Sequence, residues 1–421
     1  MRLRELTVRN IKLLADQTFS FVRADGSLRR WTVLLGDNGV CKTTVLQAIA
    51  LASSGDKMAR ALVEDAADYV RQDRPERGAE LEAAFETTNG PLSAQMHVKE
   101  GHHAFRGNDD ASRLDDVRDA RASGFFVVGY GTGRRLPRRG EVAIPRDPVA
   151  DRVEGLFDPS HKMLGVDFFE ALKEEDLGPT YARTLRDVLL EQDSNGDPLL
   201  PWLVNMELRG KHGVDQMEKL LESRRIIVDV KGPHQLWLPP HLLSQGYQST
   251  FAWIADLLGH AFLDAGEAVD PKTLEGIVLL DEIDLHLHPT WQRRIVPLLK
   301  NVFPELQFVV TTHSPLVLTG FEADEIIGLT LEGGEVVQQT FSEQPGLQTG
   351  SELMEGFFGV ATAGRPELLA MEREALELSA KDPRDPGEDE RLSELERKLA
   401  PYLEDTSFAD LDPALAERDD P

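Results

Sequence analysis

A short apolar run that ends in two adjacent carboxylates places the strongest constraint on this chain. Residues 277–280 are Ile, Val, Leu and Leu, and Asp281 and Glu282 follow at once. Four consecutive apolar residues are typical of a strand buried on both faces, as in a parallel sheet covered by helices. We therefore expect an α/β fold with an acid pair at the C-terminal tip of a buried strand. A simple strand-capping pair would look the same, so other segments must decide between the two.

A second buried strand is predicted at residues 31–35 (WTVLL), far upstream of the acids. It leads into the glycine turn GDNGVCKTT and then into a helical pattern. Strand, glycine turn and helix form the context of a phosphate-binding loop, in which backbone N–H groups and the helix N-terminus hold phosphate oxygens. The residues expected to surround these phosphates are Gly36, Asp37, Asn38, Gly39, Val40, Cys41, Lys42, Thr43 and Thr44.

Lys42 and Thr43 carry the chemistry of this loop. The ammonium group of Lys42 is expected to reach the β- and γ-phosphate oxygens, and the hydroxyl of Thr43 to face Mg²⁺. One position departs from the usual pattern G-x-x-x-x-G-K-[ST], because Cys41 stands where glycine precedes the lysine. A Cβ and a sulfur atom there would crowd the phosphates. A plain glycine turn at a helix start is the alternative interpretation of the segment.

Two further segments place polar residues at the ends of predicted elements. LSQGYQS (243–249) precedes an apolar helix, with Ser244 and Gly246 at its start. TTHSP (311–315) follows a predicted buried strand at 306–310 and puts His313 at the strand tip. A helix cap would explain the first segment equally simply, and a core histidine with satisfied hydrogen bonds is the alternative for the second.

In order, GDNGVCKTT, LSQGYQS, LLDEIDLHLHP and TTHSP resemble the motifs of the ABC/SMC-like branch of P-loop ATPases. This branch includes RecF, the OLD family and the stand-alone ATPases of Septu-type and retron-associated anti-phage defence systems. LSQGYQS departs from the family's LSGGQ signature at Gln245 and Tyr247. The resemblance implies an ABC-type P-loop ATPase head with an N-terminal antiparallel β lobe, a mixed central sheet flanked by helices, and a mostly helical insertion.

The resemblance also implies a role for each residue of the acid and loop segments. Thr43 and Asp281 would hold Mg²⁺, and Glu282 would polarise the water that attacks the γ-phosphate. His313 would contact the γ-phosphate. Lys42, Glu282 and His313 are then the catalytic residues, and ATP and Mg²⁺ are the cofactors.

The signature-like segment implies an oligomer. In the family such a segment covers the ATP of a second subunit, so Ser244 and Gly246 would complete the partner's site in a homodimer or a higher homo-oligomer.

The motif positions divide the chain into three predicted parts: an ATPase head at 1–55 and 240–360, an α/β insertion at 56–239, and an acidic helical tail at 361–421. Within the insertion, helical patterns run through residues 58–70, 181–190 and 214–221, and strand patterns through 81–85, 125–129 and 226–230. Only about a hundred residues follow His313, and they show no obvious metal cluster of the Asp-x-Asp kind, so we expect no built-in nuclease of the OLD type.

The formal net charge of −27, from 73 acidic and 46 basic side chains, argues against general nucleic-acid affinity. DNA or RNA contact would have to be local, and the best candidate is the cluster Arg134, Arg135, Arg138 and Arg139; a solvated loop is the equal alternative. A single cysteine excludes an internal disulfide. With no signal-peptide pattern and no apolar run of membrane-spanning length, we expect a cytoplasmic protein without membrane contact.

Histidines near the acid pair suggest a transition-metal site, which is the less favoured interpretation of this segment. His286 and His288 lie close to Asp281 and Asp284, but their spacing matches no recognisable transition-metal site. We expect Asp284 in a dimer-facing loop instead, and His102 and His103 on the surface.

The motifs predict an ATP-binding and ATP-hydrolysing switch, and the family resemblance implies that it controls a separate effector, such as an HNH nuclease, in anti-phage defence. The effector rests on the resemblance and on no residue of this chain. A DNA-repair or recombination ATPase of the RecF type is one alternative. A nucleotide-binding scaffold with little hydrolysis is the other, and Cys41 is the argument for it.

Overall fold

The computed structural model of the chain has two units, Met1–Gln348 and Thr349–Pro421. The first unit contains both large sheets, and the second is helical in its described part. The described residues are 1–87, 90–108, 114, 125–136, 150–164, 177–201, 203–208, 226–230, 236–238, 240–360, 366–381 and 383–402.

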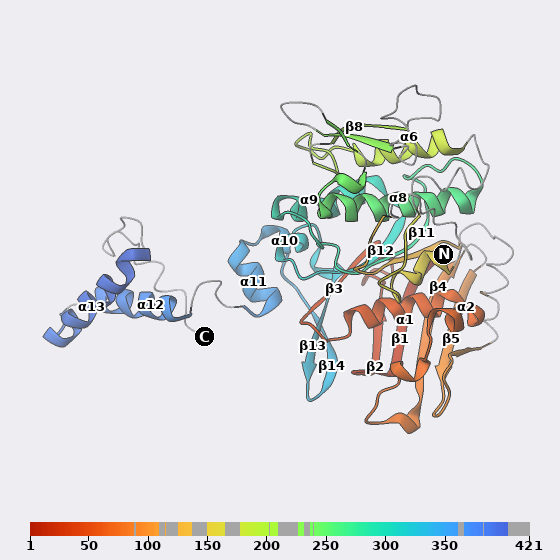
Figure 1. The fold of residues 1–421 in the computed structure, drawn as a ribbon. Coiled ribbons are helices and arrows are strands. Elements are labelled where there is room, and N and C mark those ends of the chain that lie inside the picture. Colours follow the sequence, from red (N-terminus) through yellow and green to blue (C-terminus); the bar gives the residue numbers. More distant parts are fainter. Residues whose placement is uncertain are drawn as a thin grey trace. The chain divides into compact units, whose positions relative to one another are not determined.

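A six-stranded core sheet runs through the first unit (Figure 1), in the order β14-β13-β3-β12-β11-β7. Its strands are β3 (Trp31–Gly36), β7 (Val127–Tyr130), β11 (Gly276–Leu280), β12 (Leu306–Thr311), β13 (Ile326–Glu332) and β14 (Glu335–Thr340). All pairings are parallel except that of β13 with β14. The carboxyl ends of β3, β7, β11 and β12 therefore meet along one edge of the sheet.

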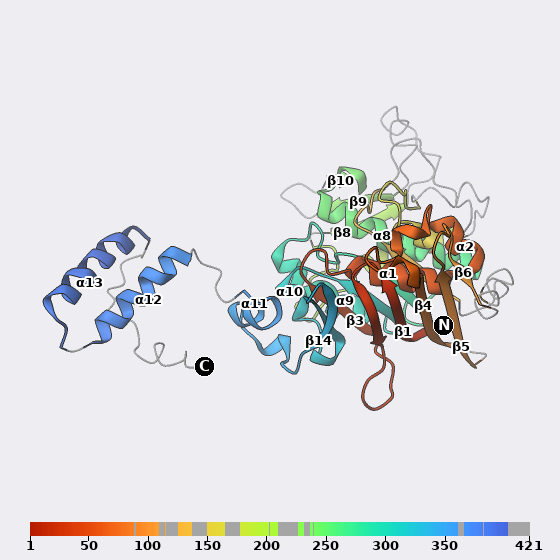
Figure 2. The ribbon, with the colours of Figure 1, turned by 90° about the horizontal axis from the view of Figure 1, so that it is seen from below.

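A second, antiparallel sheet has the strand order β2-β1-β4-β5-β6. Its strands are β1 (Arg2–Ile11), β2 (Leu14–Ser20), β4 (Ala79–Thr87), β5 (Gly90–Val98) and β6 (Arg106–Gly107). Helix α1 (Lys42–Ser54) contacts strands of both sheets, and Figure 2 shows it lying over this second sheet. Because α1 is enclosed in this way, its apolar residues are buried all around the helix and form one core with both sheets.

Helices α8 (Gln245–Ala265) and α9 (Pro289–Val302) lie on the other side of the core sheet from α1 (Figure 1). Helix α6 (Leu177–Leu189) packs on α8, where the Tyr181 hydroxyl donates to the Ala255 carbonyl at 2.9 Å. Three short helices also belong to this unit: α2 (Asp56–Leu62), α4 (Asp151–Glu154) and α10 (Pro315–Leu318). A small sheet is formed by β8 (Leu203–Leu208), β9 (Ile226–Val230) and β10 (Leu236–Leu238). The other described elements of the unit are 3₁₀ helices. No described helix is both long enough and apolar enough to cross a bilayer.

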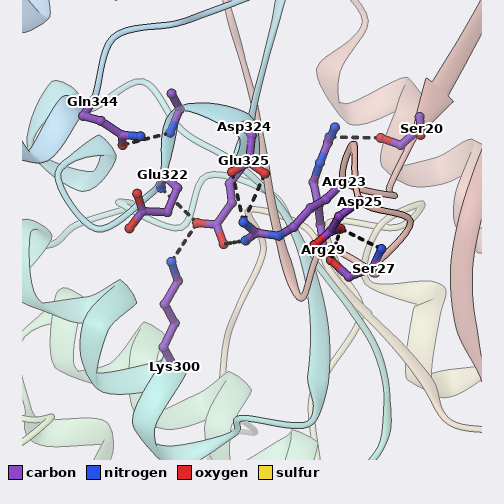
Figure 3. Close-up of polar contacts among 11 residues, drawn as sticks. Ser20, Arg23, Asp25, Ser27, Arg29, Lys300, Glu322, Asp324, Glu325 and Gln344 are labelled. Carbon is purple, nitrogen blue, oxygen red and sulfur yellow. Dashed lines mark hydrogen bonds and ion pairs between the residues drawn. The ribbon is translucent and has the colours of Figure 1, made fainter.

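A buried carboxylate just before β13 joins segments that lie far apart in the sequence (Figure 3). Glu325 is 4% exposed and lies 3.2 Å from Arg23 of the loop that precedes β3 and 2.7 Å from Lys300 of α9. Arg23 also pairs with Asp324 at 3.1 Å. Two cations around one buried carboxylate offset its desolvation, so this cluster fixes the loop, the helix and the strand against one another.

The second unit contains α11 (Gly350–Phe358), α12 (Pro366–Ala380) and α13 (Pro386–Leu399). A small apolar core of Ala375, Leu392, Leu395 and Leu399 joins α12 to α13. Ion pairs such as Arg391–Glu374 at 2.6 Å lie exposed beside it, where they contribute little.

The predicted α/β fold, with its antiparallel N-terminal sheet and mixed central sheet, is confirmed. The strands expected at 31–35, 277–280 and 306–310 are β3, β11 and β12. The helix expected at 58–70 is wrong beyond residue 62, because Val63 is extended and a 3₁₀ helix, Ala66–Tyr69, follows it. The helical pattern at 214–221 lies outside the described residues.

The residues between 56 and 239 supply strands to both large sheets. β4, β5 and β6 pair into the antiparallel sheet beside β1, and β7 completes the core sheet beside β11. The division of the chain into head, insertion and tail stays a prediction.

Candidate functional site

A cavity of about 380 Å³ opens at the carboxyl edge of the core sheet. The glycine turn after β3 contributes Asn38, Gly39, Cys41, Lys42, Thr43 and Thr44 to its lining. Asp281 and Glu282 after β11 and His313 after β12 line it as well. The structure thus brings together residues from three distant segments at the carboxyl edge of the core sheet.

The glycine turn closes tightly against β13. Gly36 has a φ of 148°, and a Cβ on it would come within 2.2 Å of the Leu329 carbonyl oxygen. The Lys42 Nζ donates to the carbonyl oxygens of Gly36 at 2.7 Å and Asp37 at 2.8 Å. Burial lowers the pKa of Lys42, and the nearby carboxylates of Asp281 and Asp37 oppose that shift. The loop therefore curls around the Lys42 amine, and the nearby acids partly offset the effect of its burial.

Cys41 is the residue before the first turn of α1 and lines the cavity. Its backbone is left-handed, with φ 65° and ψ 20°. Glycine adopts this region without a steric cost, whereas a residue with a Cβ pays on the order of 1 kcal/mol or more. The departure from the usual loop pattern therefore falls at a position whose backbone favours glycine.

A chain of hydrogen bonds joins Thr43, after the glycine turn, to the acid pair. The Thr43 hydroxyl donates to Asp281 Oδ2 at 2.8 Å, and the Thr311 hydroxyl donates to Asp281 Oδ1 at 2.6 Å. Thr311 also accepts from the Glu282 N–H at 2.7 Å. Both oxygens of the Asp281 carboxylate are held in this way, and Glu282 follows on a left-handed backbone with φ 48°.

The loop after β11 is tied to the loop after β12 through Asp284. This carboxylate accepts from the Thr312 hydroxyl at 2.6 Å and from the His313 N–H at 3.3 Å. The His313 side chain is exposed at the rim of the cavity. The His288 ring caps the N-terminus of α9 at Thr290, which is a structural role.

The arginines of the predicted cluster differ in their exposure to solvent. Arg134 is buried, and its guanidinium donates to the carbonyl oxygens of Gly131 at 2.9 Å, Glu282 at 2.7 Å and Asp281. It is therefore unavailable to a polyanion, and that expectation is wrong for this residue. Arg135 is exposed, and residues 138 and 139 lie outside the described part of the chain.

The signature-like segment begins α8 at a distance from this cavity's lining. Ser244 is the N-cap residue of α8, is exposed, and makes no side-chain capping bond. Gly246 lies so close to the loop after β11 that a Cβ on it would come within 2.4 Å of the His286 carbonyl oxygen. Neither residue is among those that line the cavity of its own chain. Their predicted contact with a second subunit's ATP stays a prediction.

Lys12, Leu13 and Thr311 line the cavity but were not predicted. The Lys12 Nζ lies 3.4 Å from the Thr44 hydroxyl and 4.8 Å from the centre of the Tyr69 ring. Its position in a tight turn between two strands gives no sequence signal for phosphate contact. Thr311 did carry a signal, because it follows the predicted strand at 306–310 directly and opens the TTHSP segment.

A comparison with known protein families identifies the family to which this chain belongs. Residues 65–319, more than half of the chain, match the family described as "AAA domain, putative AbiEii toxin, Type IV TA system". The chain belongs to this AAA-domain family. The matched residues contain the acid pair and the signature-like segment, and the glycine turn at 36–44 precedes them.

Two curated relatives of this AAA-domain chain come from bacterial systems with the names Septu and Retron. Septu protein PtuA of Bacillus mycoides (strain KBAB4) is 27% identical over 406 residues, which cover 94% of this chain and 50% of PtuA. The Retron Vc95 probable ATPase of Vibrio cholerae serotype O1 biovar El Tor is 24% identical over 386 residues, which cover 76% of this chain and 73% of that relative. The chain thus spans about half the length of the PtuA relative.

A solved structure supports the fold. The Smc head domain with an extended coiled coil, bound to the C-terminal domain of ScpA and derived from Pyrococcus furiosus, is 14% identical. The match covers 80% of this chain and 96% of that one, with a TM-score of 0.50. At this identity the likeness concerns the fold alone.

Proposed function

We propose that this AAA-domain chain binds and hydrolyses ATP and works as a nucleotide-dependent switch. The observation that carries the proposal is the bond of 2.8 Å between the Thr43 hydroxyl and Asp281, because it joins the phosphate-loop threonine to the acid strand. The two residues are separated by more than two hundred positions. Lys42 stands beside them at the mouth of the same cavity, whose volume suits a small-molecule ligand.

The donor set at this place fits a magnesium ion. Mg²⁺ prefers oxygen ligands, and it is often held by one or two protein oxygens together with phosphate and water. The Thr43 hydroxyl and the Asp281 carboxylate supply hard oxygen donors next to the loop. When bound, Mg²⁺ would neutralise charge on the phosphates.

The remaining residues have roles that follow from their positions. Lys42 holds phosphate oxygens as a cation, and the backbone N–H groups of the glycine turn surround them. Glu282 orients the attacking water and accepts its proton, since its carboxylate lines the cavity and is free of the Thr43 bond. His313, at the rim, contacts the γ-phosphate.

We further propose that two copies close around two ATP molecules, and that Ser244 and Gly246 of each copy cover the nucleotide of the other. The exposed, uncapped N-terminus of α8 supports this role. The relatives PtuA and the Retron Vc95 probable ATPase support a place in anti-phage defence. A separate effector, such as an HNH nuclease, is part of the proposal and rests on the resemblance of the motifs alone. A cytoplasmic location belongs to the same proposal.

The test compares the parent with Glu282→Gln. The amide keeps the shape of the side chain but accepts no proton, so phosphate release should fall by about 10²-fold or more while ATP binding persists. Light scattering with ATP and Mg²⁺ should then detect trapped dimers. The control is Glu332→Gln, at an exposed residue of β13. Turnover of Glu282→Gln at the parent rate would refute the role of Glu282.

The geometry of Cys41 favours a second candidate function. A side chain on a left-handed backbone at the mouth of the phosphate loop is consistent with a nucleotide-binding scaffold that hydrolyses slowly. A parent chain that binds ATP with micromolar affinity, but shows no turnover above that of Glu282→Gln, would support this candidate. The RecF-type alternative draws no support from Arg134, which is buried.

A further inference from the structure

Arg134 is a buried cation that the proposed reaction does not use directly. Its side chain is 6% exposed, whereas the neighbouring Arg135 is exposed. Its Nε donates to the Gly131 carbonyl at 2.9 Å, and its Nη2 donates to the carbonyls of Glu282, at 2.7 Å, and Asp281. One guanidinium nitrogen thus holds the two consecutive carbonyl groups of the acid pair.

This arrangement depends on the backbone conformation of Glu282. Consecutive carbonyl groups of an extended strand point to opposite sides, so a single donor cannot reach both. The left-handed φ of 48° at Glu282 turns them to the same side. The Glu282 N–H faces the other way and donates to the Thr311 hydroxyl at 2.7 Å. The residue is therefore clamped between the ends of two neighbouring strands.

The turn that carries Arg134 is itself firmly held. A Cβ on Gly131 would meet the Gly155 carbonyl oxygen at 2.2 Å, and the Gly131 N–H donates to that oxygen at 3.1 Å. The Asp281 N–H donates to the Tyr130 carbonyl at 2.8 Å. Close contacts on both sides leave the Arg134 backbone little freedom, so its guanidinium acts as a fixed support for the acid pair.

The charge of Arg134 persists at neutral pH. Burial lowers the pKa of Arg134 to about 10, and attraction to Asp281, Asp284 and Glu282 opposes the shift. Since about 10 remains far above neutrality, the guanidinium stays a donor of hydrogen bonds throughout the working range of pH.

We propose that Arg134 is a positioning residue that holds Glu282 in its left-handed conformation and so directs the Glu282 carboxylate into the cavity. The inference deepens the proposed function, because it rests on Glu282 as the base. It also gives residues 130–134 (YGTGR) a role, since Arg134 then supports the backbone of the acid pair.

The experiment uses the full chain with Arg134→Met, Arg134→Lys and the control Arg30→Met. Arg30 precedes β3 at the end of the strand away from the glycine turn, and it donates to the Glu305 carbonyl at 2.7 Å. Loss of positioning should lower kcat about 10- to 100-fold for Arg134→Met. Arg134→Lys keeps the charge and part of the bonding, so its kcat should lie in between. The dissociation constant for a fluorescent ATP analogue without Mg²⁺ should change less than about threefold in all three variants.

Several outcomes would overturn the proposal. These are an unchanged kcat in both Arg134 variants, a rise in KM at constant kcat, or an equal loss in Arg30→Met. If the parent chain binds ATP but shows no turnover, hydrolysis is refuted, and the positioning role of Arg134 can still be tested by a structure. In that case a crystal structure of Arg134→Met decides, because this variant lacks the bonds to both carbonyl groups. A backbone at Glu282 that leaves the left-handed region supports the proposal, and an unchanged φ refutes it.

Discussion

Left-handed backbone at residues with side chains is concentrated around the cavity. Among the described residues, such conformations occur at Asn10, Lys12, Cys41, Glu282 and His286. Lys12, Cys41 and Glu282 line the cavity. Each such residue costs on the order of 1 to 3 kcal/mol relative to an unstrained one, and strain of this kind persists where surrounding bonds fix it. At Glu282 the bonds from Arg134 and Thr311 compensate, whereas at Cys41 the side chain makes no capping bond.

Replacing Cys41 by glycine should therefore improve the site. The expected result for Cys41→Gly is a several-fold gain in ATP affinity or turnover, because glycine occupies the left-handed region freely and opens the mouth of the loop. Cys41→Ser is the matched control, since it keeps the Cβ and removes the thiol. A thiol-blocking reagent should inhibit the parent and neither variant. Isothermal titration and phosphate release measure the two quantities, and equal values for parent and Cys41→Gly would show that the loop tolerates the thiol.

At the scale of elements, the sequence predicts what local pattern encodes. The apolar runs at 31–35, 277–280 and 306–310 are buried on both faces, so their pattern alone predicts β3, β11 and β12. Arg134 could not be placed in this way. Its neighbours make a charged run that is typical of a solvated loop, and its burial arises only because β7 pairs with β11, a partner about 150 residues away. The cavity residues Lys12 and Leu13 were missed for the same reason, since a turn between strands gives no sign of what the rest of the fold brings to it.

Helix α8 contains a buried carboxylate that should make stability depend on pH. Asp256 is 2% exposed and accepts from the Tyr130 hydroxyl at 2.9 Å and the Leu164 N–H at 2.6 Å. Burial raises the pKa of Asp256 to about 6, against bonds that lower it. Because the folded state then binds the proton more tightly than the unfolded state, the free energy of unfolding should fall as pH rises from about 4 to about 6. The loss should be on the order of 1 to 3 kcal/mol.

Asp256→Asn should remove this dependence. The amide stays neutral, so the variant should gain stability relative to the parent between pH 5 and pH 8. His260 lies one helical turn away and acts in the opposite sense. Burial lowers the pKa of His260, so its contribution to the free energy of unfolding is lost as pH falls below about 6.5. His260 Nε2 lies 3.6 Å from Asp256 Oδ2, so the two groups titrate together. The difference between the urea-unfolding free energies of the two proteins therefore reports Asp256 together with its interaction with His260. A difference that is the same at pH 5 and pH 8 would contradict the prediction.

At the scale of the whole molecule, the proposed dimer requires that each copy contribute Ser244 to the site of the other. Ser244 is exposed at the N-terminus of α8 and does not line the cavity of its own chain. Gly246 would be a poor test of an interface, because a side chain there would collide with the His286 carbonyl of the same chain. Ser244 avoids this difficulty, so a large substitution at Ser244 should affect the assembly and leave the fold of the subunit intact.

Two inactive variants should therefore restore each other. Ser244→Arg should bind ATP as a monomer but neither dimerise nor turn over, whereas Lys42→Ala should lose its own nucleotide and keep its signature-like segment. In a mixed dimer, the intact cavity of the first variant meets the intact Ser244 of the second, so one of the two sites is complete. Because Ser244→Arg forms no dimers with itself and the mixed dimer has one complete site, phosphate release should appear in the equal mixture and be absent from either variant alone. Gln339→Arg, at an exposed residue of β14, is the control for added charge and size. Phosphate release from the mixture that does not exceed that of either variant alone would show that Ser244 does not act on the nucleotide of a second subunit.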